Sequence, residues 1–243
     1  MKRCLAAVLA CTLVVAGCSR SKPSDAPTPA PTTTSASATS STSKAPTTSA
    51  KPTTSRTPTS SSSTPAPATA GTGTFSMTGP APISGATYDS MPYVLPLNPA
   101  GPQATMVRWV EGWGESPATA EQGTTYVLGH AWGQQQLVFN PISEFVTAAV
   151  DMNNPTPVPS TNETPMQRFE TDALNGSVIT MKGAKGERQW VVDNAYLVDK
   201  YKAGFDKNLV NEHNPGRIVL IACSVSGSQD LGYNVVVEGH LKD

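Results

Sequence analysis

The chain has 243 residues with 17 Lys and Arg against 18 Asp and Glu, so its formal net charge at pH 7 is −1. That balance hides a split, because residues 75–243 carry ten basic and seventeen acidic side chains, a net charge near −7. Phosphate contacts need clustered Lys and Arg, so an acidic domain of this kind is not expected to bind nucleic acid.

The first eighteen residues have the features of an export signal. A basic start, Met1-Lys2-Arg3, precedes an apolar run that ends in Val15-Ala16-Gly17-Cys18. The run is too short to span a bilayer permanently. Its last four residues resemble a bacterial lipobox, in which Cys18 becomes the lipid-modified first residue; the alternative is an ordinary signal peptide cleaved at small residues. We expect residues 1–18 to be a lipoprotein signal peptide and Cys18 to anchor the protein to the outer face of the cytoplasmic membrane.

Residues 19–74 consist almost entirely of Ser, Thr, Pro and Ala, with scattered Lys and Arg and a single acid, Asp25. Such a segment cannot bury enough apolar surface to offset chain entropy, so we expect a disordered tether. Extended like polyproline, about 55 residues at roughly 3.1 Å each would reach on the order of 170 Å. That length suits a stalk that carries a domain from the membrane into the cell wall, and the composition permits O-glycosylation.

From residue 75 onward the composition is that of one globular domain with a real core. Short strand-like runs dominate it, separated by Gly, Pro and Asn. They are Met106–Val110, Thr124–Leu128, Gln136–Phe139, Ser177–Met181, Gln189–Val192, Tyr196–Tyr201, Arg217–Ala222 and Asn234–Val237. We also expect a hairpin turn at Lys182–Gly186, a helix at Ile142–Val150 and a long loop at 152–165. This pattern predicts an all-β domain, either a closed barrel or a sandwich.

A single cysteine follows the most apolar of these runs. Cys223 comes directly after Ile218–Ala222, and it is the only cysteine of the domain, so a disulfide within the domain is excluded. A lone cysteine at a strand end in an exported protein is a candidate nucleophile when a histidine can reach it. The alternative is a small buried core residue.

Three histidines can be compared as partners. His130 follows a predicted strand and Gly129, which places it to face a groove, although a packed histidine at a barrel rim has the same pattern. His213 lies in a solvated turn, and His240 is three residues from the C-terminus. No cluster of Cys and His has the spacing of metal ligands, so we expect no metal site.

Taken together, three motifs resemble the sortase family, and more narrowly the actinobacterial sortases grouped as class F. They are VLGHA at 127–131, LIACS at 220–224 and YNVVVEG at 233–239. Residues 107–130 look like the run into the catalytic histidine of that family, and Tyr93–Pro102 resembles its early strand and turn. NGSVITM at 175–181, with the strand after it, is similar to its mid-barrel hairpin. The resemblance covers roughly residues 80–243 and keeps the order of the elements.

The resemblance implies a closed β-barrel of about eight strands with short helices. It also implies a transpeptidase in which Cys223 is the nucleophile and His130 the catalytic histidine. The thiolate would attack a carbonyl in a C-terminal sorting signal and form a thioacyl enzyme, while His130 protonates the leaving amine and later deprotonates the incoming one. The implied partner is a peptide or protein with such a signal; no cofactor is implied, and we expect a monomer.

Two positions depart from the family pattern. The threonine that usually precedes the cysteine is Ala222 here, and the arginine near the start of the last strand is missing, because that place reads Gly232-Tyr233-Asn234. Asn234 can donate an amide hydrogen bond to an oxyanion, but it brings no charge. Without a fixed cation, the Cys223 thiol should ionise less readily.

Other cations are candidates to replace the missing arginine. Arg217 is six residues before Cys223 on one strand, about 20 Å away, and is therefore a poor substitute. Arg108 or Arg188 would have to approach from another strand.

Two functions remain open from the sequence. One is a sortase-like cysteine transpeptidase of the cell envelope. The other is a catalytically impaired sortase-fold protein that binds wall peptide or a protein partner, which the missing arginine favours. The L,D-transpeptidase type of cysteine enzyme matches poorly, because its signature places an arginine two residues after the cysteine, where this chain has Val225.

Overall fold

The computed structural model describes residues 72–243, and the expected signal peptide, tether and anchor residue Cys18 lie outside these residues. Within this part of the chain, no helix is both long and apolar enough to cross a bilayer. The elements are β1 Gly73–Met77, β2 Ile83–Pro92, β3 Met106–Gly114, β4 Thr125–Leu128, α1 Asn140–Ala149, β5 Thr156–Val158, β6 Met166–Thr171, β7 Val178–Gly183, β8 Gly186–Asp199, β9 Arg217–Ser226 and β10 Gln229–Leu241. Short 3-10 turns, η1 Ala120–Gln122 and η2 Ala203–Phe205, interrupt two of the connections.

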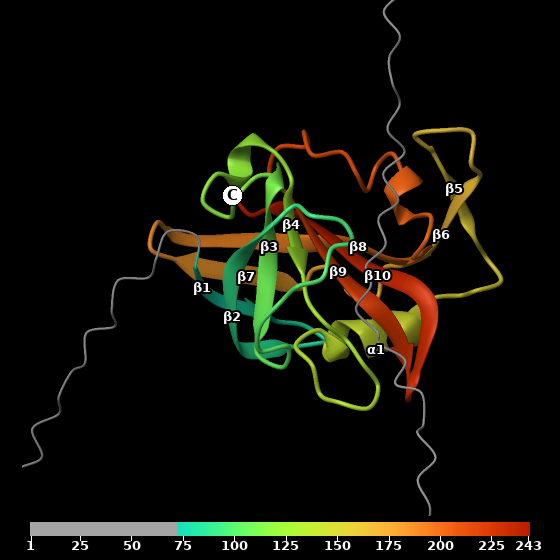
Figure 1. Ribbon diagram of the computed structural model, residues 1–243, viewed down its shortest axis with the longest axis horizontal. Helices are drawn as coiled ribbons and strands as arrows, with labels where there is room; N and C mark the ends of the chain where they lie inside the picture. Colours follow the sequence, from blue (N-terminus) through green and yellow to red (C-terminus); the bar gives the residue numbers. More distant parts are fainter. Residues whose placement is uncertain (1–71) are drawn as a thin grey trace, which may run out of the picture. The chain divides into compact units, whose positions relative to one another are not determined.

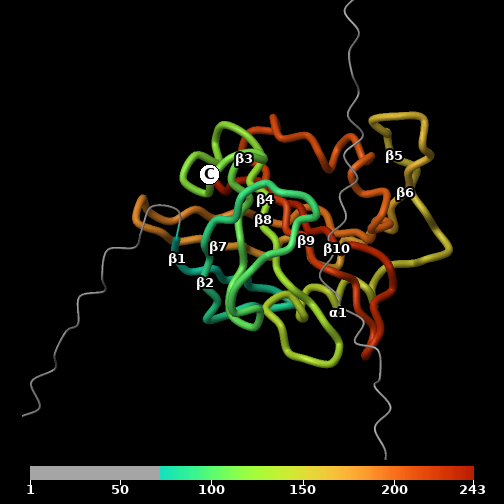
Figure 2. The backbone as a smooth tube through the Cα atoms, viewed as in Figure 1, coloured from blue at the N-terminus to red at the C-terminus, as the bar shows by residue number. Residues whose placement is uncertain are grey.

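Eight of these strands form a closed barrel (Figure 1). Their order is β10-β9-β4-β3-β2-β1-β7-β8, and β8 pairs with β10 to close the ring. The β5–β6 hairpin extends from the free part of the β8 edge, on the side away from β1 and β2 (Figure 2). The predicted all-β domain and its barrel of about eight strands are therefore confirmed, and the sandwich alternative is wrong.

Side chains that alternate along the strands give the barrel an apolar interior and an apolar outer face. One apolar cluster takes residues from all eight barrel strands and so fills the interior, with Ile218, Leu220 and Ala222 as its contribution from β9. The next residues along, Val219 and Ile221, belong to a second cluster on the outer face. Both faces of β9 are thus covered, as expected for a strand that reads as a continuous apolar run.

The outer cluster is covered by connections rather than by another sheet. Leu97 reaches it from the β2–β3 connection, and Ala203 and Leu209 reach it from the segment between β8 and β9. At the barrel end, α1 packs against β9, β10 and β8, and it buries Ile142 and Val146 in the interior cluster (Figure 1). The predicted helix Ile142–Val150 is confirmed with a slightly earlier start.

Two predicted strands are one strand in the structure. Gln189–Val192 and Tyr196–Tyr201 both fall in β8, except that β8 ends at Asp199. The strands β8 and β10 stay paired across an irregularity, where Glu238 is opposite Asn194 and Gly239 is opposite Val192. The extra residue, Asp193, makes this a β-bulge, and the polar pair Asp193-Asn194 in the sequence had suggested a break instead.

Two other strand predictions are wrong. Gln136–Phe139 is a turn that leads into α1. The side-chain amide of Asn140 accepts from the N–H of Leu137 and donates to the carbonyl O of Gln135, so these main-chain groups do not pair with another strand. Tyr93–Pro102 is a connection, and the early strand lies before it as β2. The segment 152–165 is largely a loop, but it contains the short strand β5.

Candidate active site

Cys223 lies in β9, its partner Asn234 lies in β10, and His130 follows β4, the other neighbour of β9. In the parallel pair of β4 and β9, Leu128 is opposite Ile221, and the N–H of Gly129 donates to the carbonyl O of Ile221 at 3.1 Å. His130 and Cys223 each follow this last pair by two residues, and His130 lies just beyond the end of β4. On the other side of β9, Asn234 of β10 is the direct partner of Cys223.

These positions share the outer face of the barrel. Leu128, Ile221 and Val236 belong to the outer cluster, and His130, Cys223 and Asn234 are each two residues away from one of them along the chain. Because side chains alternate along a strand, residues two apart lie on the same face. The register therefore pairs Cys223 with Asn234, and it ends two residues before His130 on the neighbouring strand β4.

The ring of His130 is fixed by a main-chain contact. Its Nε2 lies 2.7 Å from the carbonyl O of Pro99, in the β2–β3 connection. A carbonyl oxygen only accepts, so Nε2 carries the proton in this contact. In the neutral imidazole the lone pair then resides on Nδ1, which forms no hydrogen bond to a described residue. This tautomer leaves one ring nitrogen ready to take a proton.

The backbone at Cys223 is held by a side chain from α1. The hydroxyl of Ser143 donates to the carbonyl O of Cys223 at 2.7 Å and accepts from the N–H of Val225 at 3.1 Å. The pairing of β9 with β10 is irregular here, because Val225 is opposite Asp230 while Cys223 is opposite Asn234. Ser143 thus satisfies polar groups of a backbone that leaves the regular ladder, and it fixes the position of the cysteine.

Asn234 is a buried amide with unused hydrogen-bonding capacity. Its Oδ1 is fully enclosed and has no hydrogen-bond partner. Buried polar atoms without a partner are uncommon and costly, so each such atom calls for an explanation. Its place opposite Cys223 offers one, because an oxygen that only accepts is available to an N–H group of a bound peptide, whereas an oxyanion would need the Nδ2 of the same amide.

The three side chains are closed off from solvent in this structure. The exposed fractions are 5% for His130, 3% for Cys223 and 1% for Asn234. The β2–β3 connection covers the histidine through Pro99, and its Leu97 is fully buried in the outer cluster. The thiol is therefore buried, and a peptide can reach it only after residues around Cys223 move.

None of the arginines named from the sequence replaces the missing one. Val198 is the partner of Asn234 on β8, and Arg188 lies ten residues before Val198. The distance between Arg188 and Val198 along the strand is about 33 Å. Arg108 sits opposite Leu128 but is bound to Asp89 and to the carbonyl O atoms of Ser90 and Ala100.

A lysine not considered from the sequence lies closer. Lys200 directly follows the end of β8. Its N–H donates to the carbonyl O of Gly232, and its Nζ is 2.5 Å from Oδ2 of Asp230. The segment before Asn234 is therefore contacted by a cation, which is paired with Asp230 of that segment.

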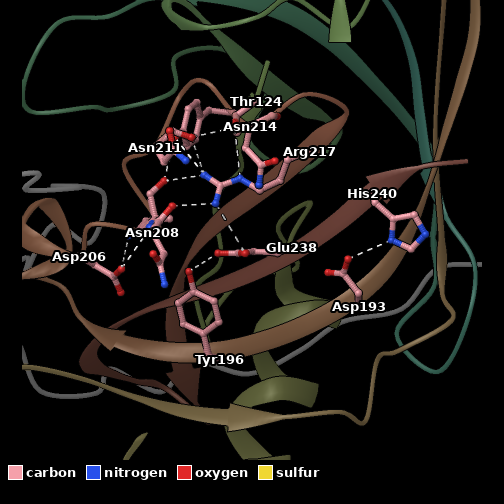
Figure 3. Close-up of polar contacts among 12 residues, drawn as sticks. Thr124, Asp193, Tyr196, Asp206, Asn208, Asn211, Asn214, Arg217, Glu238 and His240 are labelled. Atoms are coloured by element: carbon pink, nitrogen blue, oxygen red, sulfur yellow. Dashed lines mark hydrogen bonds and ion pairs between the residues drawn. The ribbon is translucent and has the colours of Figure 1, made fainter. Parts of the chain in front are cut away.

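The other histidines lie elsewhere. His213 is exposed beside Glu212, and Nδ1 of His240 is 3.0 Å from Oδ2 of Asp193, a pair on the surface (Figure 3). Among residues 72–243, no group of three or more His, Cys, Asp and Glu side chains is arranged to hold a metal ion.

The segment after His130 is shaped by residues that sequence reasoning missed. The side-chain amide of Asn140 accepts from the N–H of Trp132 and donates to the carbonyl O atoms of Trp132 and Gln135. A Cβ on Gly133 would come within 1.2 Å of the carbonyl O of Gly227, so the loop after His130 packs directly on the β9–β10 turn. An Asn at a helix start is a visible signal; the contact between the two glycines is not.

No model of a known protein family matches the sequence, and no curated protein matches it. Among solved structures, the chain is similar to sortase A from Listeria monocytogenes, with 13% identity, a TM-score of 0.42, and coverage of 70% of this chain and 88% of that one. It is similar to a lid mutant of sortase A from Corynebacterium diphtheriae, with 14% identity, a TM-score of 0.43, and 70% of each chain covered. Sortase C-1 from Actinomyces oris matches with 12% identity, a TM-score of 0.41, and 70% and 73% of the two chains covered.

Proposed function

We propose that the protein is a cysteine transpeptidase of the sortase type, with Cys223 as nucleophile and His130 as general base and acid. The observation that carries the proposal is the direct pairing of Cys223 with Asn234, next to a β4–β9 register that ends two residues before His130 and Cys223. The sequence motifs around these three residues, with their resemblance to class F sortases, support the same assignment.

The first step of the proposed reaction is formation of a thioacyl enzyme. Nδ1 of His130 takes the proton of the Cys223 thiol, and the thiolate attacks a peptide carbonyl. The imidazolium that forms is stabilised by Pro99, because Nε2–H already donates to its carbonyl O. His130 then gives the proton to the leaving amine, and the peptide C–N bond breaks.

The second step transfers the acyl group. An incoming amine loses a proton to Nδ1 of His130 and attacks the thioester carbonyl, and the Cys223 sulfur leaves as the thiol after taking that proton back. The amide of Asn234 is placed to donate to the oxyanion in both steps. One well-placed donor of this kind contributes about 10²- to 10³-fold to the rate.

We further infer that the domain works outside the cell. A signal peptide at residues 1–18, a lipid on Cys18 and a disordered tether at 19–74 would hold the barrel domain in the cell wall, within reach of a protein that carries a C-terminal sorting signal. The supporting observations are the lipobox-like ending and the Ser/Thr/Pro composition of the tether.

The test is to trap the thioacyl intermediate. The full chain is incubated with peptides that carry sorting signals, without an acceptor amine, and intact mass is measured. We expect an added acyl mass on the wild type and on the surface variant Ser228→Ala, and none on Cys223→Ala. An adduct on Cys223→Ala, or adduct formation that persists undiminished in His130→Gln, contradicts the proposed roles.

A second candidate function is peptide binding without catalysis. It is favoured by the place of Asn234, which gives no positive charge beside the thiol, and by the burial of Cys223. In that case peptides bind without an adduct, and Cys223→Ala binds them as tightly as the wild type does.

A further inference from the structure

A polar cavity of about 390 Å³ opens on the outer face of the barrel, between the β5–β6 hairpin and the segment that precedes β9. We call it the amide cavity, because Asn194, Asn208, Asn211 and Asn214 are among its lining residues. Neither Cys223 nor His130 lines it. Arg217, at the cavity, and Cys223 are six residues apart on β9, about 20 Å.

The floor of the amide cavity is built at the β-bulge of β8. Glu238 of β10 is opposite Asn194, next to the extra residue of the bulge. A bulge changes the direction of the side chains around it, and bulges are frequent beside binding sites. The hydroxyl of Tyr196 donates to Oε1 of Glu238 at 2.5 Å, which fixes this carboxylate (Figure 3).

The wall of the cavity is the segment 206–214, and the protein holds that segment by its main chain. The guanidinium of Arg217 donates to the carbonyl O atoms of Asn208 at 2.7 Å, of Leu209 at 3.0 Å and of Asn211 at 3.0 Å (Figure 3). From the other side, Oδ1 of Asp206 accepts from the N–H groups of Asn208 and Leu209, each at 3.1 Å.

These contacts are made by main-chain atoms, so they leave the asparagine side chains of the segment available for other hydrogen bonds. Within residues 72–243, the side-chain amides of Asn208 and Asn214 form no hydrogen bond, although both line the cavity. The main chain of this wall is already ordered before a ligand arrives, so the ordering left for binding is that of the exposed side chains of Asn208 and Asn214.

The charges in the cavity argue against an anionic ligand. Arg168 is held by two contacts to Asp206, at 2.6 and 2.8 Å. The guanidinium of Arg217 donates its hydrogen bonds to carbonyl and hydroxyl oxygens of the protein. Glu238 also lies 4.0 Å from Arg168 and 3.8 Å from Arg217. The two guanidinium groups and this carboxylate are therefore structural, and the groups left for a ligand are the amides and the carboxylate of Glu170.

We propose that the amide cavity binds a neutral sugar residue of a glycan. Hydroxyl groups both donate and accept, so they match a lining of amides, which do the same, and of a carboxylate, which accepts. Val158 is the apolar contributor to the lining, so the cavity does not suit an apolar ligand. The volume lies within the range of small-ligand pockets, about 300 to 1,000 Å³.

The experiment is an NMR titration of the full chain, following side-chain amide signals. The probes are N-acetylglucosamine, glucose and galactose, an oligosaccharide of N-acetylglucosamine, and glycine as a small zwitterion. We expect saturable shifts at Asn208 and Asn214 with at least one sugar, either free or in the oligosaccharide. The double variant Asn208→Ala/Asn214→Ala should weaken binding at least tenfold, whereas Asn175→Ala, an exposed asparagine outside the cavity, should leave it unchanged.

Three results overturn the proposal: no saturable shift with any sugar, tighter binding of glycine than of every sugar, or equal weakening by Asn175→Ala. The cavity does not depend on the proposed transpeptidase activity. Cys223→Ala should bind sugar as the wild type does, so the failure of one proposal is distinguishable from the failure of the other.

Discussion

Asn234 on β10 is the direct cross-strand partner of Cys223 on β9, and both side chains are buried on the outer face of the barrel. Directly opposed residues have Cβ atoms about 4.5 to 5.5 Å apart, so the amide lies within reach of any group bonded to the thiol sulfur. Oδ1 of Asn234 has no hydrogen-bond partner in this arrangement. The residue opposite Cys223 on β10 thus carries a neutral amide, in which Oδ1 is the acceptor without a partner and Nδ2 is the donor that an oxyanion would need.

The first prediction concerns this amide. Asn234→Leu keeps a similar volume but removes the donor, so we expect acyl-enzyme formation to slow by about 10²-fold, the effect typical of one lost oxyanion donor. Rates are measured by intact mass after rapid mixing with peptide. Asn234→Arg adds a positive charge beside the thiol, and this variant should form the acyl enzyme at the wild-type rate or faster.

The outcome with Asn234→Arg also separates the two candidate functions. If the wild type forms no adduct and this variant does, the protein has kept the site and lost the charge. If Asn234→Leu reacts as fast as the wild type, the amide has no part in the reaction.

The second prediction concerns the contact between α1 and β9. Ser143→Ala leaves the carbonyl O of Cys223 and the N–H of Val225 without their buried partner, which should cost about 1 to 3 kcal/mol of unfolding free energy. Urea unfolding measures this loss. Ser228→Ala, in the exposed turn after β9, is the control and should change the unfolding free energy little. A loss equal to that of the control would mean that Ser143 does not hold the strand.

Much of the fold follows from the sequence, and the reasons for the misses are specific. The strand at Arg217–Ala222 and the helix at Ile142–Val150 are both recognisable from runs of apolar residues. The pairing of β8 with β10, which closes the barrel, is not, because a period of two shows which face a strand buries and not which strand it meets. The strands β1 and β2 were not predicted for a different reason: they have fewer apolar residues in a row.

The candidate site divides in the same way. Cys223, His130 and Asn234 carry side-chain chemistry that a sequence displays. The partner of His130 is the main-chain oxygen of Pro99, and no residue pattern marks a carbonyl group for this role. Ser143 is 80 residues from Cys223 along the chain, and a serine in a helix has no feature that points to a distant strand.

The third prediction concerns the anchor. Cys18→Ser removes the sulfur that would carry the lipid, so we expect the protein to leave the membrane fraction and appear in the medium. Fractionation followed by immunoblotting measures this. Cys11→Ser, within the apolar run of the proposed signal peptide, is the control and should stay with the membrane. Unchanged membrane association of Cys18→Ser contradicts lipid anchoring.

The fourth prediction concerns stability at alkaline pH. Burial, with the charge of Glu238 added to it, raises the pKa of Tyr196 well above its ordinary value. In the unfolded chain a tyrosine ionises at about pH 10. Above that pH the unfolded state has lost a proton that the folded state keeps, so the unfolding free energy falls as pH rises from about 10 toward the higher folded pKa.

Variants of two tyrosines test whether Tyr196 causes the unfolding free energy to fall as pH rises. Urea unfolding is measured at about pH 9 and about pH 11, on either side of the ordinary tyrosine pKa. Tyr196→Phe should lower the unfolding free energy at the lower pH, because the hydrogen bond to Glu238 is lost, and should show a smaller further decrease at the higher pH. Tyr201→Phe, at an exposed position, should keep the wild-type decrease. An unchanged decrease in Tyr196→Phe contradicts the prediction.

The last prediction compares two ion pairs that differ in burial. Arg168 and Asp206 are joined by contacts of 2.6 and 2.8 Å, with side-chain exposures of 4% and 0%. Arg188 and Glu121 are joined at 2.8 Å, but their exposures are 32% and 50%. Removing one partner of a buried pair leaves an unpaired buried charge and costs about 3 to 5 kcal/mol, whereas an exposed pair contributes about 0 to 1 kcal/mol. We therefore expect Asp206→Asn to shift the urea midpoint strongly and Glu121→Gln to shift it little.

Asp206→Asn should also abolish sugar binding, since Asp206 holds the main chain of Asn208 at the wall of the amide cavity. Equal midpoints for the two variants would mean that the Arg168–Asp206 pair does not hold this segment in place.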